Sequence, residues 1–171
     1  MRLLTNRIVQ HLDQKNIAYE RLNHKRDYHA RQTASDCRLM PAGFAKVVGV
    51  EADGRPFLAV LPADQHVDLP RLQGLLGVDR IALLPEHSLA TFFPDCEVGA
   101  IPPLGNLYGL AVYVAPALTR QEKIAFNAGT HEQAIRMKYK DFELMVRPTV
   151  LDFACPASDA KAGGGERCRP S

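Results

Sequence analysis

Two β-rich runs, residues 45–50 and 56–61, flank the dipeptide Asp53-Gly54. An Asp-Gly pair between two such runs is a strong hairpin signal, because both residues tolerate the positive φ angles of a tight turn. We therefore expect the two runs to pair as antiparallel strands, and this hairpin constrains the fold more than any other segment.

The rest of the chain mixes helical and extended patterns. Apolar spacing and capping residues predict helices over 5–16, 31–38, 68–76, 85–93 and 139–146, the first capped by Thr5, the third capped by Asp68 and stopped by Gly77. Extended runs predict strands over 17–22, 80–84, 107–115, 123–127 and 133–137. Hairpin strands with helices inserted between them indicate an α+β domain on a mixed, largely antiparallel sheet or barrel-like core with flanking helices.

Composition is typical of one globular domain. The chain has 171 residues, 46% of them hydrophobic and 23% charged, and we expect a single domain over 1–154 followed by a disordered, glycine-rich tail over 155–171. No apolar run suits a membrane span and no secretory leader is recognisable, so we expect a cytoplasmic protein. The formal net charge of +2 permits contact with RNA, which would have to be gripped locally.

The four cysteines are Cys37, Cys96, Cys155 and Cys168, and no two have the spacing of a zinc knuckle. We expect reduced thiols without a structural role. A metal-dependent hydrolase using His24, His29 and Cys37 is a minor alternative, because the spacing of these three residues is irregular.

Lys46 stands out because it lies within the apolar stretch 44–50. In a strand its side chain shares a face with Val48 and Val50, so an ammonium group lies among apolar groups. A buried ammonium needs a carboxylate, a lowered pKa or an anionic ligand. From the strand pattern alone, a lysine that guards a sheet edge or extends to solvent is the more common case.

Two further segments could carry chemistry. Residues 99–105 contain two glycines and two prolines, so they should form a loop of fixed shape whose N–H groups could stabilise an oxyanion. His131 follows a glycine turn and could act as an acid or base, since its pKa lies near neutrality. Taken singly, an ordinary turn and a structural histidine remain the simpler interpretations.

Together the motifs resemble the YbaK and prolyl-tRNA-synthetase-associated editing domain family. The resemblance spans about 44–146 and rests on five segments in order: 46–50, 53–54, 58–64, the Gly99-x-x-x-Pro103 loop and 126–132. It implies a freestanding hydrolase that deacylates tRNA carrying the wrong small amino acid, such as Ala, Cys, Ser or Thr, often on proline tRNA. The implied partners are the acceptor end of aminoacyl-tRNA and an aminoacyl-tRNA synthetase, without membrane or DNA, and the resemblance implies no bound metal and no organic cofactor.

The resemblance also implies residue roles. Lys46 matches the lysine that holds the phosphate of the terminal nucleotide, Gly99 and Pro103 match the loop beside the aminoacyl group, and His131 matches the pocket histidine. On this basis the expected catalytic residues are Lys46, Gly99 and His131, and the expected substrate contacts are Lys46, Ala100, Ile101, Pro103, Gly129, Thr130 and His131.

The chain departs from the family pattern in three places. Pro102 is a second proline in the loop, Leu104 stands where an aromatic residue is frequent, and residues 23–40 show no recognisable motif. The resemblance therefore does not predict which amino acid this chain would remove. The alternative function is a module that binds the tRNA end or an amino acid without hydrolysing anything.

Overall fold

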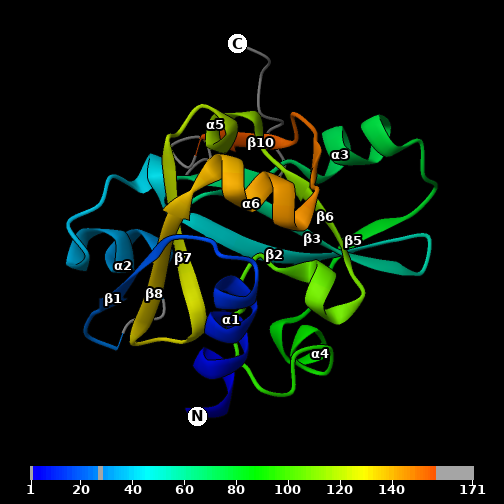
Figure 1. Ribbon diagram of the computed structural model, residues 1–171. Coiled ribbons are helices and arrows are strands. Elements are labelled where there is room, and N and C mark those ends of the chain that lie inside the picture. Colours follow the sequence, from blue (N-terminus) through cyan, green and yellow to red (C-terminus); the bar gives the residue numbers. More distant parts are fainter. Residues whose placement is uncertain (1, 27–28, 157–171) are drawn as a thin grey trace.

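The computed structural model describes residues 2–26 and 29–156 (Figure 1). The helices are α1 (Arg2–Gln14), α2 (Ala30–Asp36), α3 (Leu69–Leu76), α4 (Glu86–Ala90), α5 (Pro116–Thr119) and α6 (Tyr139–Val146), with 3-10 turns η1 (Pro41–Gly43) and η2 (Gly105–Tyr108). The strands are β1 (Tyr19–Asn23), β2 (Ala45–Ala52), β3 (Arg55–Pro62), β4 (Gln65–Val67), β5 (Ile81–Leu83), β6 (Ala111–Val114), β7 (Lys123–Thr130), β8 (Gln133–Lys138), β9 (Thr149–Val150) and β10 (Ala154–Pro156).

The strands form three open sheets with helices packed around them, which confirms the α+β class. The largest sheet has the order β5-β2-β3-β6-β9, and two smaller sheets have the orders β1-β8-β7 and β10-β4. Pairing is antiparallel except at β3–β6 and β6–β9, which are parallel. The sheets keep free edges instead of closing into a barrel. In Figure 1, α1 and α6 lie on the viewer's side of the sheets.

The predicted hairpin is confirmed. β2 and β3 pair antiparallel over their whole length, from Ala45 opposite Pro62 to Ala52 opposite Arg55. Asp53 and Gly54 make the turn with φ angles of 48° and 79°, the positive values that a two-residue hairpin turn requires. The hairpin fixes the strand on which Lys46 lies.

The third predicted helix is also confirmed, because its end signals are local. The Asp68 side chain accepts a hydrogen bond from the Arg71 backbone N–H, and Gly77 ends α3 in the left-handed conformation with φ 64°.

Four expectations need correction. Thr5 does not cap the first helix, because α1 begins at Arg2. The strand expected over 107–115 is limited to β6, since η2 occupies the preceding residues. Cys155 is disulfide-bonded rather than reduced, whereas Cys37 and Cys96 are free. Of the tail expected over 155–171, the first two residues belong to β10 and the others lie outside the described residues.

Gly105 lies where η2 packs against the large sheet and has no room for a side chain. A Cβ atom there would stand 2.6 Å from the Leu110 carbonyl oxygen and 2.7 Å from Val112 Cγ2. We expect Gly105→Ala to lower the free energy of unfolding by about 1–3 kcal/mol, because backbone must shift. Gly74→Ala is the matched control, since a Cβ there meets nothing within 4 Å and alanine favours α3 by about 0.5–1 kcal/mol. Urea unfolding of both variants measures the difference; equal stabilities would contradict the packing.

Candidate active site

A cavity of about 520 Å³ lies along the first half of β2, within the size range of small-molecule sites. β5 pairs with β2 only at residues 50–52, so this half of β2 has no β5 partner and its residues can face the cavity. The lining residues are His29, Ala30, Arg31, Ala45, Lys46, Val47, Val48, Ala63, His66, Glu86, Gly99, Ile101 and Asn127. The cavity thus contains Lys46 and part of the predicted loop.

The Lys46 side chain is half-buried in the cavity wall, and its ammonium group makes no hydrogen bond or ion pair with any described residue. Burial lowers the pKa of Lys46, the Asp64 carboxylate partly offsets this by raising it, and the Arg31 guanidinium lowers it further. Val48 and Val50, which share its strand face, pack in one apolar cluster, while Ala45 and Val47 pack in the other. The predicted alternation is confirmed, and an anionic ligand would offset the cost of the half-buried charge.

The loop opposite β2 is held against the end of β7 by backbone hydrogen bonds. The Gly129 N–H donates to the Ala100 carbonyl at 2.9 Å, and the Gly129 carbonyl accepts from the Glu97 N–H at 2.8 Å. The Ala100 N–H donates to the Glu97 carbonyl at 3.0 Å. Ala100 is therefore removed from the set of possible oxyanion donors.

Gly99 and Ile101 keep that possibility. Both line the cavity, and within residues 2–26 and 29–156 neither backbone N–H donates a hydrogen bond. Ile101 is buried, and a buried N–H is costly unless water or a ligand accepts its hydrogen bond, whereas Gly99 is exposed and water can accept from its N–H. These two N–H groups are the remaining candidates for donors to a bound carbonyl group.

His131 does not line the cavity. Its side chain is only 2% exposed, its Nε2 lies 2.6 Å from the Val98 carbonyl oxygen, and its ring packs beneath Gly99. A Cβ atom on Gly99 would stand 3.3 Å from His131 Cε1, and Gly99 has a φ of +83°. The histidine thus supports the loop from behind, and Gly99 lacks a side chain for both steric and conformational reasons.

Four other expected substrate contacts, Ala100, Pro103, Gly129 and Thr130, are also absent from the cavity lining. Ala100 and Pro103 are buried, and Gly129 bonds the loop through its backbone. Thr130 is 8% exposed, and its Oγ1 is buried without a hydrogen-bond partner. The structure therefore brings Lys46, Gly99 and Ile101 together at the cavity and places Ala100, Pro103, Gly129, Thr130 and His131 outside its lining.

Asn127 is a cavity residue that the sequence did not single out. Phe44, just before β2, and Ala125 in β7 form a parallel bridge. Lys46 and Asn127 each lie two residues further along these two segments. The Asn127 Oδ1 is buried and accepts no hydrogen bond from any residue that the structure describes. A side-chain amide in this state at a cavity wall is suited to a polar ligand group.

Residues from the region 23–40, which shows no recognisable family motif, also line the cavity. α2 and the residue before it contribute His29, Ala30 and Arg31, and α4 contributes the Glu86 carboxylate. In the sequence, Ala30-Arg31 is only a small residue followed by a cationic one, and such a pair is too common to identify a binding site. Among described residues, no group of three or more His, Cys, Asp or Glu side chains is placed to hold a metal ion, so His24, His29 and Cys37 do not form such a cluster.

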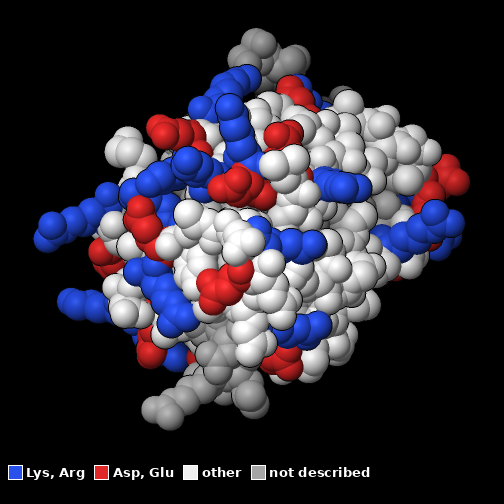
Figure 2. Space-filling model, viewed as in Figure 1, with Lys and Arg blue, Asp and Glu red and all other residues white. Residues whose placement is uncertain are grey.

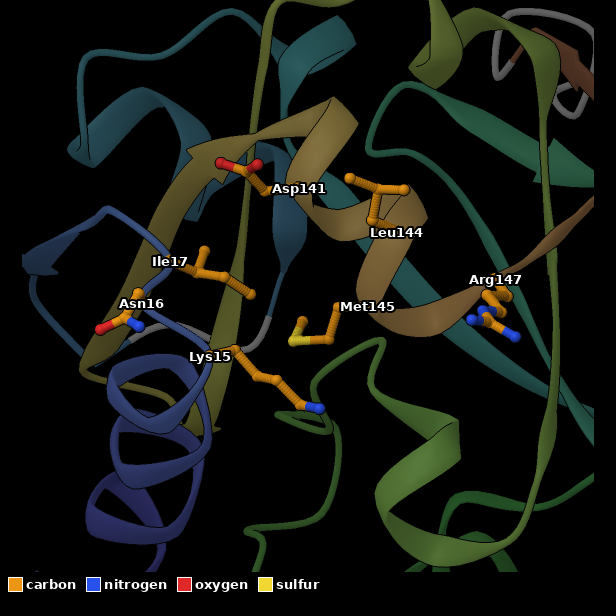
Figure 3. A pocket seen from close by; sticks show the side chains of 7 residues that line it. All are labelled: Lys15, Asn16, Ile17, Asp141, Leu144, Met145 and Arg147. Carbon is orange, nitrogen blue, oxygen red and sulfur yellow. The ribbon is translucent and has the colours of Figure 1, made fainter.

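A second cavity, of about 410 Å³, lies between the end of α1 and α6 (Figure 3). Its lining residues are Lys15, Asn16, Ile17, Asp141, Leu144, Met145 and Arg147, and none of them lines the first cavity.

On the face drawn in Figure 2, basic and acidic side chains are interspersed, so this face has no broad basic surface. None of the described helices has the length and apolar character needed to cross a bilayer.

Comparison with known proteins identifies the family. The model of the aminoacyl-tRNA editing domain matches residues 24–144. A curated relative, the multifunctional Ser/Thr-tRNA deacylase ProXp-y of Escherichia coli (strain K12), is 33% identical over 97 residues, which cover 56% of this chain and 58% of the relative. The chain thus spans less than two thirds of that relative's length.

Solved structures share the fold. A putative trans-editing enzyme for prolyl tRNA synthetase superposes with a TM-score of 0.74 at 16% identity, covering 86% of this chain and 94% of the other. A putative signal transduction protein from Marinobacter aquaeolei superposes with a TM-score of 0.70 at 16% identity, covering 91% of this chain and 32% of the other. Since the family model spans most of the chain and includes every residue that lines the first cavity, the chain belongs to the aminoacyl-tRNA editing domain family.

Proposed function

We propose that this chain hydrolyses the ester bond between a tRNA and a wrongly attached small amino acid. One observation carries the proposal: a single cavity is lined by Lys46, Gly99 and Ile101, and among the described residues the Lys46 ammonium group and the Gly99 and Ile101 N–H groups form no hydrogen bond. A phosphate next to an ester carbonyl, as found at the aminoacyl end of tRNA, matches this combination of charge and donors.

The reaction needs little from the protein. Lys46 binds the phosphate of the terminal nucleotide, and the Gly99 and Ile101 N–H groups hold the carbonyl oxygen as it becomes negative. Water attacks the carbonyl carbon, the bond to the ribose oxygen breaks, and that oxygen leaves with a proton that originates from the water. The neighbouring ribose hydroxyl already activates the ester, so positioning and oxyanion stabilisation can suffice without a protein nucleophile. His131 supports the loop from behind.

The cavity wall favours a small substrate. Much of it consists of short aliphatic side chains, Ala30, Ala45, Val47 and Ala63, with Asn127 as an unpartnered polar group. A hydroxyl group both donates and accepts, as an amide does, and the relative ProXp-y is named as a Ser/Thr-tRNA deacylase. We include seryl- and threonyl-tRNA among the proposed substrates, beside alanyl- and cysteinyl-tRNA.

The proposal extends to partner and compartment. A mischarged tRNA is the product of an aminoacyl-tRNA synthetase, so we propose a synthetase as the functional partner that supplies the substrate. A role in translation also implies a cytoplasmic location.

The test follows ester loss from one tRNA charged in turn with alanine, cysteine, serine, threonine or proline. Release of at least one small amino acid, faster than without protein, is the expected result. Salt-dependent tRNA binding without any release would favour a binding module instead.

Asn127→Leu tests the selection of a hydroxyl group, because leucine keeps the shape of asparagine and removes both polar atoms. We expect the variant to lose about 10-fold to 100-fold in kcat/KM for seryl-tRNA and much less for alanyl-tRNA, since a hydrogen bond to the substrate is lost. Equal losses for both esters would show that Asn127 does not distinguish the side chains.

A further inference from the structure

One carboxylate joins the cavity loop to two other segments. Glu97 Oε2 accepts the His131 backbone N–H at 3.1 Å and lies 3.0 Å from Arg26 Nη2. The backbone of the same residue accepts from Ala100 and donates to Gly129. Glu97 therefore holds the start of the loop through its backbone and its side chain together.

The Glu97 side chain does not line the cavity, but its neighbours in sequence do. Gly99 and Ile101 line the cavity two and four residues after Glu97. The Glu97 side chain is 19% exposed. A charged hydrogen bond with limited exposure to water holds geometry better than an open surface ion pair does.

Arg26 also has a second carboxylate partner, which provides a control. Its Nη1 lies 3.4 Å from Glu132 Oε1, and the Glu132 side chain is 57% exposed. Among the described residues, Glu132 binds Arg26 and its side chain forms no hydrogen bond or ion pair with the loop, so the two carboxylates separate loop positioning from the general attachment of Arg26.

We propose that Glu97 is a positioning residue for ester hydrolysis: its carboxylate fixes the loop so that the Gly99 N–H keeps its place relative to Lys46. This inference rests on the proposed function, because it assigns Glu97 a role in that reaction. Glu97 touches no reacting group, so its loss should act on the rate of the bound complex. A shift of about 1 Å in such a group can cost about 100-fold in rate.

The experiment compares Glu97→Ala, Glu97→Gln and Glu132→Gln. Steady-state rates are measured with seryl-tRNA or alanyl-tRNA, whichever the unsubstituted chain hydrolyses faster, over a range of aminoacyl-tRNA concentration. We expect Glu97→Ala to lower kcat about 100-fold with KM changed less than about threefold. Glu97→Gln keeps an oxygen for the His131 N–H and should recover most of the rate, and Glu132→Gln should match the unsubstituted chain.

Hydrogen exchange of the His131 backbone amide, followed by NMR, supplies a readout that does not depend on activity. We expect exchange at least about tenfold faster in Glu97→Ala and near normal in Glu97→Gln, because only the alanine variant removes the acceptor. A normal kcat in Glu97→Ala, a loss confined to KM, or unchanged His131 exchange would overturn the proposal. If the unsubstituted chain released no amino acid, the proposed function would fail, and Glu97 would be judged by the exchange rate alone.

Discussion

Lys46→Ala should reduce deacylation by about 100-fold or more, because a half-buried ammonium that binds a phosphate contributes a charge-assisted contact that neutral groups cannot replace. The Lys46 ammonium group makes no ion pair or hydrogen bond with a described residue, so its charge is available to a ligand. The measurement is the initial rate of ester loss on the tRNA that the unsubstituted chain deacylates fastest.

Removing the charge of Lys46 should not lower the stability of the fold, although it should lower activity. Burial lowers the pKa of Lys46, which means that the folded state disfavours the charged form relative to the unfolded chain. Lys46→Met keeps the length of the side chain and removes the charge, so its melting temperature should equal or exceed that of the unsubstituted chain. Loss of activity without loss of stability would identify Lys46 as a ligand-binding group.

Lys123→Ala is the matched control. Lys123 also lies on a strand, but it pairs with Glu20 at 3.3 Å and does not line the cavity. We expect its variant to keep activity within about twofold, since exposed ion pairs contribute little. Normal activity in folded Lys46→Ala, or equal losses in the two variants, would contradict the assignment of Lys46.

Gly99→Ala should be the second most damaging change, with deacylation lowered about 100-fold. Its φ of +83° is strained for alanine, and the added Cβ would stand 3.3 Å from His131 Cε1. The imidazole cannot easily retreat, because its Nε2 is held 2.6 Å from the Val98 carbonyl oxygen. The loop must therefore move and carry the Gly99 and Ile101 N–H groups away from the ester.

Gly54→Ala separates backbone strain from loop displacement. Gly54 has a φ of +79°, nearly that of Gly99, but a Cβ there meets nothing within 4 Å. Both variants should lose stability of about 1–2 kcal/mol from the strained backbone, measured by urea unfolding, while only Gly99→Ala should lose activity. If Gly99→Ala retained normal activity, the loop would not supply the oxyanion donors.

The sequence by itself determined the features that depend on neighbouring residues. Asp53-Gly54 fixed the β2–β3 hairpin, because few other residue pairs tolerate two positive φ angles in succession. Asp68 and Gly77 fixed the ends of α3 through hydrogen bonds within one turn. The helix expected over 139–146 is α6, and an extended segment after the first helix is β1.

The family resemblance, carried by motifs in order, located two of the three predicted catalytic residues at the cavity. Lys46 and Gly99 line it, while His131 lies behind the loop. The register of β7 with β8 shifts between Asn127 and Thr130. Such a bulge alters the direction of the residues that follow it, and no single-sequence pattern predicts where it occurs.

Only the tertiary structure decided which groups meet. The bridge between Phe44 and Ala125 brings Asn127 beside Lys46, although more than eighty residues separate them in the sequence. The structure also decided that the Ala100 N–H donates a hydrogen bond within the loop, whereas the Gly99 and Ile101 N–H groups donate none to a described residue. Local sequence determines turns and helix ends because their hydrogen bonds are local; it cannot determine a cavity whose walls come from distant strands, since their contacts exist only after the sheets have packed.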